Sequence, residues 1–222
     1  MGLPVLIEGE SGSGKSRSLK NFKPGEISIF NVAGKPLPFK NNGLATLSVA
    51  KIVKANKGKS RYDVIKAAMF QSKSKAFAID DSQYLMAFDS FDKAKELGYG
   101  KFTDMAVSFE RLIEFVINDL PSDVIVYFLH HVELTDGGKY KAKTIGKMLD
   151  NQLTVEGLFS IVLFCTADEN HHYFITQSRG ISTAKSPEDM FDDEIENDLK
   201  FVDTKIREYW GLTPNNIESE EK

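Results

Sequence analysis

The chain is poor in cysteine, and it has no long apolar run and no excess of positive charge. Its 222 residues include one cysteine, Cys165, which excludes a disulfide framework and a cysteine-rich zinc site. Because Cys165 lies within the apolar run SIVLFCT, we expect it in the core. No apolar run approaches the roughly 20 residues that a helix needs to cross a bilayer, so we expect no membrane association.

The overall charge also limits the function. A formal net charge of −4 argues against a globally basic nucleic-acid binder, so any such contact has to come from a local patch. An apolar segment begins at Leu3 and leaves no room for a signal peptide, which predicts a cytoplasmic protein. With 41% hydrophobic residues and no internal repeat, the composition is typical of one globular domain. We expect this domain to span residues 1–212, with residues 213–222 as an acidic, disordered tail.

The segment Glu8–Ser16, EGESGSGKS, has the spacing G-x-x-x-x-G-K-[ST] of a phosphate-binding loop. Glycines let the backbone turn so that N–H groups point at a triphosphate, while Lys15 reaches the β- and γ-phosphates and the Ser16 hydroxyl binds Mg²⁺. The apolar run Leu3–Glu8 before it and the helical segment Arg17–Phe22 after it give the required order of strand, loop and helix. A flexible Gly/Ser linker fits poorly, because it would interrupt a buried strand. The predicted ATP contacts are Gly9, Glu10, Ser11, Gly12, Ser13, Gly14, Lys15, Ser16 and Arg17.

A second signal is the apolar strand Ala76–Asp81, AFAIDD, which ends in two carboxylates. In nucleotide-binding folds of this kind, a terminal aspartate carries the Mg²⁺ ligand toward the phosphate loop. We therefore predict that Asp80 and Ser16 hold the metal, with Asp80 acting through water. Asp81 is then the nearest candidate to orient or deprotonate the attacking water. The alternative for Asp81 is a helix cap or a solvated turn acid.

The apolar run Val124–Leu129, VIVYFL, predicts another buried strand, which ends in two histidines. A polar residue at this point would face the γ-phosphate as a sensor. We favour His131 over His130, because Val132 and Glu133 follow as the chain leaves the sheet. The alternative is a pair of loop histidines. A metal role is less favoured, because adjacent histidines cannot easily share one ion.

The segment Asp136–Lys147, DGGKYKAKTIGK, concentrates positive charge in an otherwise acidic chain. A glycine-hinged basic loop that carries an aromatic residue suits the backbone of single-stranded DNA with a base stacked on the ring. The alternative is a solvated hairpin. The predicted DNA contacts are Lys139, Tyr140, Lys141, Lys143 and Lys147.

The remaining pattern predicts an α/β fold of the P-loop NTPase type, with a mostly parallel twisted sheet, flanking helices and a late antiparallel hairpin at one edge. The stretch Leu44–Lys54 is ambiguous between strand and helix, and Thr103 is expected to cap the following amphipathic helix. Further expected elements are a strand over 26–30, a helix starting near Ser60, a long helix over 104–120, a hairpin over 160–177 and a helix within 194–210.

With GESGSGKS, AIDD and FLHH in place, the chain resembles phage and prophage P-loop ATPases with a minimal RecA-like core, some of which are single-strand annealing recombination proteins. The segments KTIGKMLDNQLTVEGLFSIVLF, YFITQ, AKSPEDMF and ENDLKFVDTKIREY extend the resemblance over nearly the whole chain. The resemblance implies a phage-encoded, Mg²⁺-dependent ATPase in the bacterial cytoplasm. It also implies assembly into a ring or filament on single-stranded DNA, with a single-strand-binding protein as a further candidate partner.

The same resemblance assigns roles to individual residues. It places His131 where RecA-like proteins end a strand with a polar γ-phosphate sensor, and it makes Lys185 a cation that enters a neighbouring subunit's site. Together with Lys15 and Asp81, which the motifs themselves suggest, His131 completes the predicted catalytic set. One departure is clear, because FNVAGKPLP follows the second strand where such recombinases carry a catalytic glutamate. Asp81 or Glu10 would have to replace it, or hydrolysis is slow.

The missing glutamate and the acidic overall charge make an NTP-dependent switch acting on proteins the alternative function. A small-molecule kinase is a weaker third possibility, because an arginine-rich lid is missing.

Overall fold

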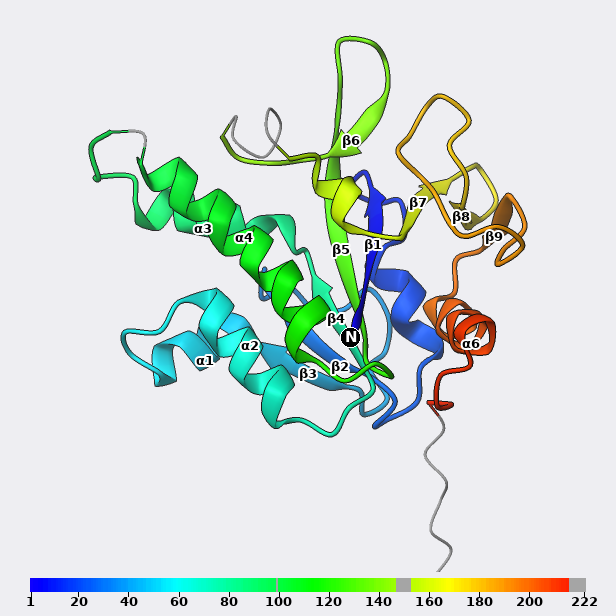
Figure 1. The fold of residues 1–222 in the computed structure, drawn as a ribbon, viewed down its shortest axis with the longest axis horizontal. Helices are drawn as coiled ribbons and strands as arrows, with labels where there is room; N and C mark the ends of the chain where they lie inside the picture. The colour runs from blue at the N-terminus through cyan, green and yellow to red at the C-terminus, as the bar shows by residue number, and fades with distance from the viewer. Residues whose placement is uncertain (99, 147–152, 216–222) are drawn as a thin grey trace, which may run out of the picture.

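The computed structural model describes residues 1–98, 100–146 and 153–215, and its main feature is one mostly parallel sheet (Figure 1). In these residues nine strands run in the order β3-β2-β4-β5-β1-β7-β8-β9, with β6 paired to β5. The strands are β1 (Leu3–Gly9), β2 (Ser28–Asn31), β3 (Ala45–Ser48), β4 (Ala76–Asp80), β5 (Ile125–Leu134), β6 (Tyr140–Ala142), β7 (Ile161–Ala167), β8 (His172–Ile175) and β9 (Glu194–Glu196).

Strand β1 lies at the centre of the parallel part, between β5 and β7. Strands β2, β3 and β4 continue the parallel sheet beyond β5. At the other edge β7, β8 and β9 are antiparallel, which confirms the predicted late hairpin and adds a third strand to it. Because the parallel strands share one direction, the segments that follow β1, β2 and β4 meet at the same edge of the sheet.

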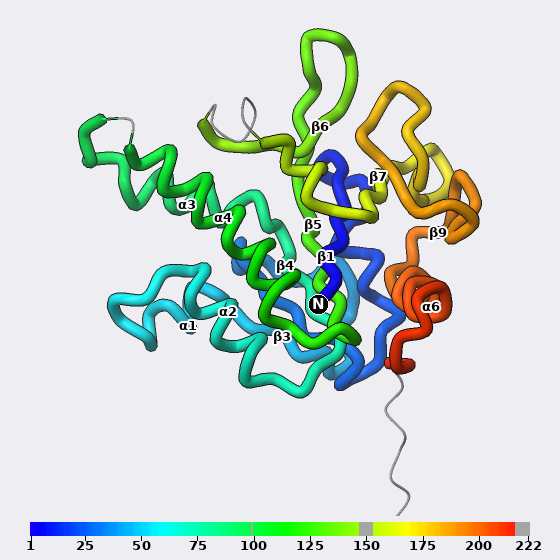
Figure 2. The backbone as a smooth tube through the Cα atoms, viewed as in Figure 1, coloured from blue at the N-terminus to red at the C-terminus, as the bar shows by residue number. Residues whose placement is uncertain are grey.

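Helices cover both faces of the sheet, as Figures 1 and 2 show. Helices α1 to α4 pack on one face, while α6 and the 3₁₀ helix η1 pack on the other. The helical segments are η1 (Ser16–Asn21), α1 (Val49–Ala55), α2 (Arg61–Gln71), α3 (Gln83–Asp92), α4 (Gly100–Asp119), η2 (Val155–Leu158) and α6 (Leu199–Trp210). Among the described residues, no helix combines the length and hydropathy that crossing a membrane demands.

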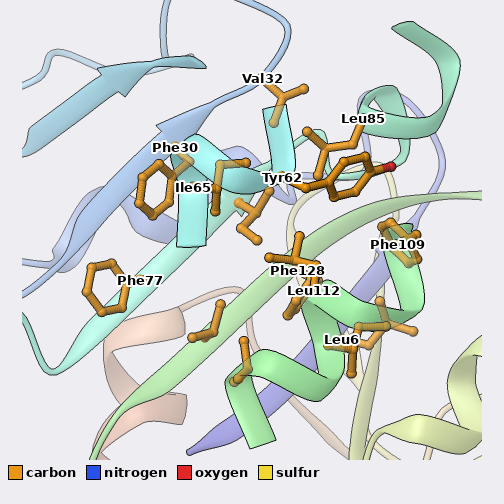
Figure 3. Packing of buried hydrophobic residues seen from close by; sticks show 14 of the residues in the cluster. Leu6, Phe30, Val32, Tyr62, Ile65, Phe77, Leu85, Phe109, Leu112 and Phe128 are labelled. Carbon is orange, nitrogen blue, oxygen red and sulfur yellow. The ribbon is translucent and has the colours of Figure 1, made fainter. Parts of the chain in front are cut away.

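Alternation along the strands divides the core between these two layers. Leu6 and Phe128 face the α2–α4 layer, where Phe109 packs edge-on against Phe128 at 6.3 Å between ring centroids (Figure 3). Their neighbours Val5 and Ile7 face the opposite layer, with η1 and α6. Strands buried on both faces read as continuous apolar runs, which is why LPVLI and VIVYFL were recognisable in the sequence.

Several boundaries differ from the predictions. The predicted strand end at His130 and His131 is wrong, because β5 continues to Leu134 by pairing with β6. Thr103 does not cap α4, which starts at Gly100. In this extra turn the Lys101 amine donates to the carbonyl oxygen of Lys93, at the end of α3, and to that of Glu96.

Three other segments can be compared directly with the sequence predictions. The stretch 44–54 contains strand β3 followed by helix α1, so both patterns were present in it. The expected helix after the glycine-rich loop is only the six-residue η1, because Phe22 turns extended ahead of Pro24. The capping box at Ser60 is confirmed: Asp63 N–H donates to Ser60 Oγ at 3.1 Å, and Ser60 N–H to the Asp63 carboxylate at 3.1 Å.

Candidate functional site

The segment after β1 is a glycine-rich loop that packs tightly against β7 and β8. A Cβ on Gly9 would lie 2.4 Å from the carbonyl oxygen of Cys165, so no other residue fits there. Gly14 has φ +108°, and a Cβ on it would lie 2.8 Å from His172 Nδ1. His172 Nδ1 also donates to the Ser13 carbonyl at 2.7 Å. The glycines therefore allow the loop to be held close to the antiparallel edge of the sheet.

Lys15 is buried at the end of this loop. Its Nζ donates to the carbonyl oxygens of Gly9 and Glu10, each at 2.7 Å. Burial lowers the pKa of Lys15 from its ordinary value. These bonds close the loop on itself, and Lys15 is one of the residues that line the adjacent cavity.

Ser16 and Asp80 meet across the sheet edge, as the sequence predicted. Ser16 Oγ donates to Asp80 Oδ1 at 2.6 Å, although the two residues are 64 positions apart. Burial raises the pKa of Asp80, while the hydrogen bond from Ser16 works in the opposite direction. A hydroxyl and a carboxylate side by side are oxygen donors of the kind Mg²⁺ prefers, so this pair fits the predicted metal.

Asp81 lies next to this pair and is held from two sides. His131 Nε2 donates to Asp81 Oδ1 at 3.0 Å, and Lys35 Nζ contacts Asp81 Oδ2 at 2.7 Å. Burial alone would raise the pKa of Asp81, but the hydrogen bonds from His131 and Lys35 hold it below its ordinary value. Asp81 also has φ 59°, a left-handed conformation that is uncommon outside glycine. Because both oxygens are engaged, Asp81 is a weak candidate for taking a proton from water.

These groups share one cavity of about 290 Å³ at the carboxyl edge of the parallel strands. Of the predicted nucleotide contacts, Gly9, Glu10 and Ser13 do not line it. Sequence reasoning missed Lys35, Pro36 and Pro38, for which the only available signal was the segment GKPLP after β2, and it missed His172 on β8. The lining residues are Ser11, Gly12, Gly14, Lys15, Ser16, Arg17, Lys35, Pro36, Pro38, Asp80, Asp81, His131 and His172.

His130 has a different environment from His131. It is buried on the α4 side of the sheet, 5.5 Å from the Phe109 ring, and burial lowers its pKa to about 4. Its Nε2 lies 2.9 Å from the Lys143 carbonyl, to which it donates, so its Nδ1 accepts from the Ser82 hydroxyl at 2.8 Å. His130 is therefore a neutral core residue, and His131 is the histidine that lines the cavity.

The predicted lysine segment forms a hairpin between β5 and β6, which projects beyond the carboxyl edge of the sheet (Figure 1). Lys141 pairs with Glu133 at 3.1 Å. The Tyr140 ring packs on Phe164 at 5.3 Å, and the neighbouring Glu10 carboxylate raises the pKa of Tyr140. Lys139 borders a second cavity beside the hairpin. The hairpin alternative is thus correct for its backbone, whereas DNA binding stays a prediction.

The predicted cation Lys185 lies away from the cavity. Lys185 forms a backbone bridge with Val162, with N–H to oxygen distances of 2.8 and 2.9 Å, so its segment is fixed against β7. Lys185 does not line the cavity of its own subunit. Lys147 lies outside the described residues, as does the predicted acidic tail from residue 216 onward.

Comparison with known protein families gives no match. No curated protein matches the sequence at a significant level either. The functional assignment therefore depends on the geometry of the site and on the sequence motifs.

A buried acid lies directly before the glycine-rich loop. Glu8 Oε1 accepts from the Thr183 hydroxyl at 2.6 Å, while Oε2 has no hydrogen-bond partner among the described residues. Burial raises the pKa of Glu8 to about 7, and the nearby Glu156 adds to this effect. Glu156 in turn accepts from the Ala142 N–H at 2.7 Å, which ties this acidic pair to β6.

We expect Glu8→Gln to stabilise the protein at pH 8 but not at pH 4.5. The folded-state pKa of Glu8 lies above the unfolded value, so the native state binds the proton more tightly and loses stability as pH rises toward 7. At about 1.4 kcal/mol per pKa unit, ionised Glu8 costs up to about 3 kcal/mol above pH 7. Urea unfolding at both pH values measures the difference, with exposed Glu194→Gln as control. An equal effect of Glu8→Gln at the two pH values would contradict the prediction.

Proposed function

We propose that the protein is a RecA-like P-loop ATPase that binds ATP with Mg²⁺ in the 290 Å³ cavity and acts on single-stranded DNA. The observation that carries the proposal is the meeting of Lys15, Ser16 and Asp80 in one cavity, on a loop with the G-x-x-x-x-G-K-[ST] spacing. A chance match to the motif would not require an aspartate 64 residues away to hydrogen-bond the motif's serine.

The cavity's charges suit a triphosphate with a bound cation. Lys15, Arg17 and Lys35 supply positive charge, and the Ser16–Asp80 pair supplies oxygen ligands. When bound, Mg²⁺ would neutralise charge on the β- and γ-phosphates. The protein's own part is to bind the phosphates through Lys15 and the loop N–H groups, and to orient the metal through Asp80.

We propose slow hydrolysis, because neither candidate for the missing glutamate is well placed as a base. Glu10 does not line the cavity and lies next to Tyr140. Asp81 is engaged by His131 and Lys35. His131, held by Asp81 at the cavity wall, is suited to contact the terminal phosphate as the predicted sensor.

The DNA-binding part of the proposal rests on the β5–β6 hairpin and on the resemblance to annealing proteins. The hairpin lies beside the segment 178–183, since the Tyr140 N–H donates to the Ile181 carbonyl at 2.8 Å. Two glycines, Gly137 and Gly138, form its turn. We propose that it contacts the DNA backbone in a ring or filament of subunits, in which Lys185 would approach a neighbour's cavity.

We expect the triple variant Lys139→Ala, Lys141→Ala and Lys143→Ala to bind single-stranded DNA more weakly and with less salt dependence. Each lost phosphate contact flattens the slope of log affinity against log salt by about 0.7. Fluorescence anisotropy with a labelled oligonucleotide, Mg²⁺ and an ATP analogue at several salt concentrations gives this slope. The matched control replaces three exposed lysines in and after α1, Lys51, Lys54 and Lys57. An unchanged slope in the hairpin variant would rule the hairpin out.

A second function is favoured by the pairing of the hairpin's charges. Lys141 is partnered by Glu133, Tyr140 packs on Phe164, and the net charge of the chain is −4. These contacts suit an NTP-dependent switch or assembly factor that acts on protein partners. Sedimentation with an ATP analogue, with and without single-stranded DNA, separates the two functions. Assembly that responds to the nucleotide and is indifferent to DNA would favour the switch.

A further inference from the structure

The loop after β2 is built to present one lysine to the cavity. Two hydrogen bonds from the Asn31 side chain stabilise this loop. Asn31 Oδ1 accepts from the Gly34 N–H at 2.7 Å, and Asn31 Nδ2 donates to the Lys35 carbonyl at 2.6 Å. Gly34 supplies the left-handed turn with φ +71°, and Pro36 restricts the backbone after the lysine. The position of Lys35 is thus determined by its own segment.

The loop is also tied to the strand that carries the two aspartates. Asn31 is in register with Asp80 across the β2–β4 pair, and the Val32 N–H donates to the Asp80 carbonyl at 3.3 Å. The Lys35 amine then lies 2.7 Å from Asp81 Oδ2 and 5.6 Å from the centre of the Tyr84 ring. Backbone pairing and an ion pair therefore hold the amine at the same cavity wall as Asp80.

Stability does not account for this arrangement. The Lys35 side chain is 61% exposed, and ion pairs to exposed lysines contribute little to folding. Asp81, by contrast, is almost buried and adopts a left-handed backbone with φ 59°, which few residues other than glycine adopt. A buried carboxylate in a left-handed conformation that holds an exposed amine at a cavity is typical of a functional site.

The position of the amine indicates which part of a nucleotide it would contact. Under the function proposed above, Ser16 and Asp80 hold the metal that bridges the β- and γ-phosphates. Asp81 follows Asp80 directly, and Lys35 lines the same cavity, so its amine would be within reach of phosphates bridged by that metal. Lys15 approaches the same phosphates from the glycine-rich loop.

We propose that Lys35 is a cation supplied within the same subunit that binds the terminal phosphate of the triphosphate, with Asp81 as its positioning residue. This inference rests on the proposed nucleotide site. Lys35 keeps its proton throughout and offers up to three N–H donors to charge that develops on the γ-phosphate oxygens. The segment where RecA-type recombinases carry an acid would therefore contribute a positive charge instead.

The test compares a triphosphate with a diphosphate, because only the triphosphate has the group that Lys35 would contact. Calorimetry in Mg²⁺ measures the Kd of ATPγS and of ADP for the intact protein, Lys35→Ala, Lys35→Arg and the exposed control Lys40→Ala from the same loop. Lys35→Ala should weaken ATPγS binding roughly 10- to 100-fold and ADP binding much less, as expected for one lost charged hydrogen bond. Lys35→Arg should restore most of the preference, and Lys40→Ala should not change it.

The outcomes separate this inference from the proposed function. If the intact protein binds both nucleotides and Lys35→Ala weakens them equally or not at all, the role of Lys35 is wrong while the nucleotide site stands. If the intact protein binds neither nucleotide, the proposed function fails and the inference fails with it. Far-ultraviolet circular dichroism of each variant shows that it is folded, as expected for replacement of an exposed side chain.

Discussion

Replacing Lys15 with methionine is expected to weaken ATP binding by about 100-fold or more, because the phosphates lose a buried cation and its charged hydrogen bonds. The fold should persist. Methionine fills a similar volume, and removal of a buried ammonium offsets the loss of its bonds to the Gly9 and Glu10 carbonyls. Calorimetry with ATP and Mg²⁺ measures the affinity, and urea unfolding without nucleotide measures the stability.

The matched control for Lys15→Met is Lys20→Met, at the exposed end of η1. It removes the same charge a short distance along the chain but outside the cavity. A control that loses as much affinity would mean that the effect of Lys15 comes from net charge alone. Retention of near-normal ATP affinity by Lys15→Met would refute the nucleotide site, since no other buried lysine lines that cavity among the described residues.

Replacing Arg207 with methionine is expected to lower the free energy of unfolding by about 3–5 kcal/mol, the usual cost of leaving a buried charge without its partner. Arg207 Nε donates to Asp203 Oδ2 at 2.8 Å within helix α6. Its guanidinium also donates to the carbonyls of Lys75 and Asp123, at 2.8 Å each. Those carbonyls precede β4 and β5, so one side chain fastens α6 to the amino ends of two central strands.

The large loss of stability expected for Arg207→Met follows from Asp203, which would lose its cationic partner. Asp203 is fully buried, and its other donors among the described residues are neutral, of which the Tyr127 hydroxyl at 3.0 Å is the closest. Urea unfolding should therefore show partial recovery when Asp203→Asn is added to Arg207→Met, because the uncompensated charge is gone. Lys205→Met, which removes an exposed pair with Glu208 on the same helix, should change stability by less than about 1 kcal/mol. A comparable loss in both single variants would contradict the buried-pair explanation.

The sequence predicted those parts of the fold that depend on local patterns. The apolar runs of β1, β4 and β5 and the Ser60 capping box were recognisable because burial on both faces and helix capping each leave a short-range signal. The continuation of β5 was not recognisable. Residues 132–134 are polar in part, and they are strand only because β6 pairs with them.

The residues of the candidate site also include some that the sequence could predict and one that it could not. Lys15, Ser16, Asp80 and His131 could be predicted to share a cavity, since each follows a predicted strand that ends at one edge of the sheet. Lys35 could not be predicted, because its role depends on a salt bridge to Asp81, 46 positions away, and on a hydrogen bond from the Asn31 side chain to its carbonyl. No periodicity or motif marks a contact of that kind.

Cys165 provides a natural chemical probe of the glycine-rich loop after β1. Its thiol donates to the Ser13 carbonyl at 3.3 Å from below the loop, and Asn197 Nδ2 approaches the sulfur at 3.2 Å. Burial raises the pKa of this thiol to about 11, so it is unreactive while the loop is closed over β7. Since no second cysteine competes, the rate of thiol labelling reports how often the loop and β7 separate, and it does so in the unmodified chain.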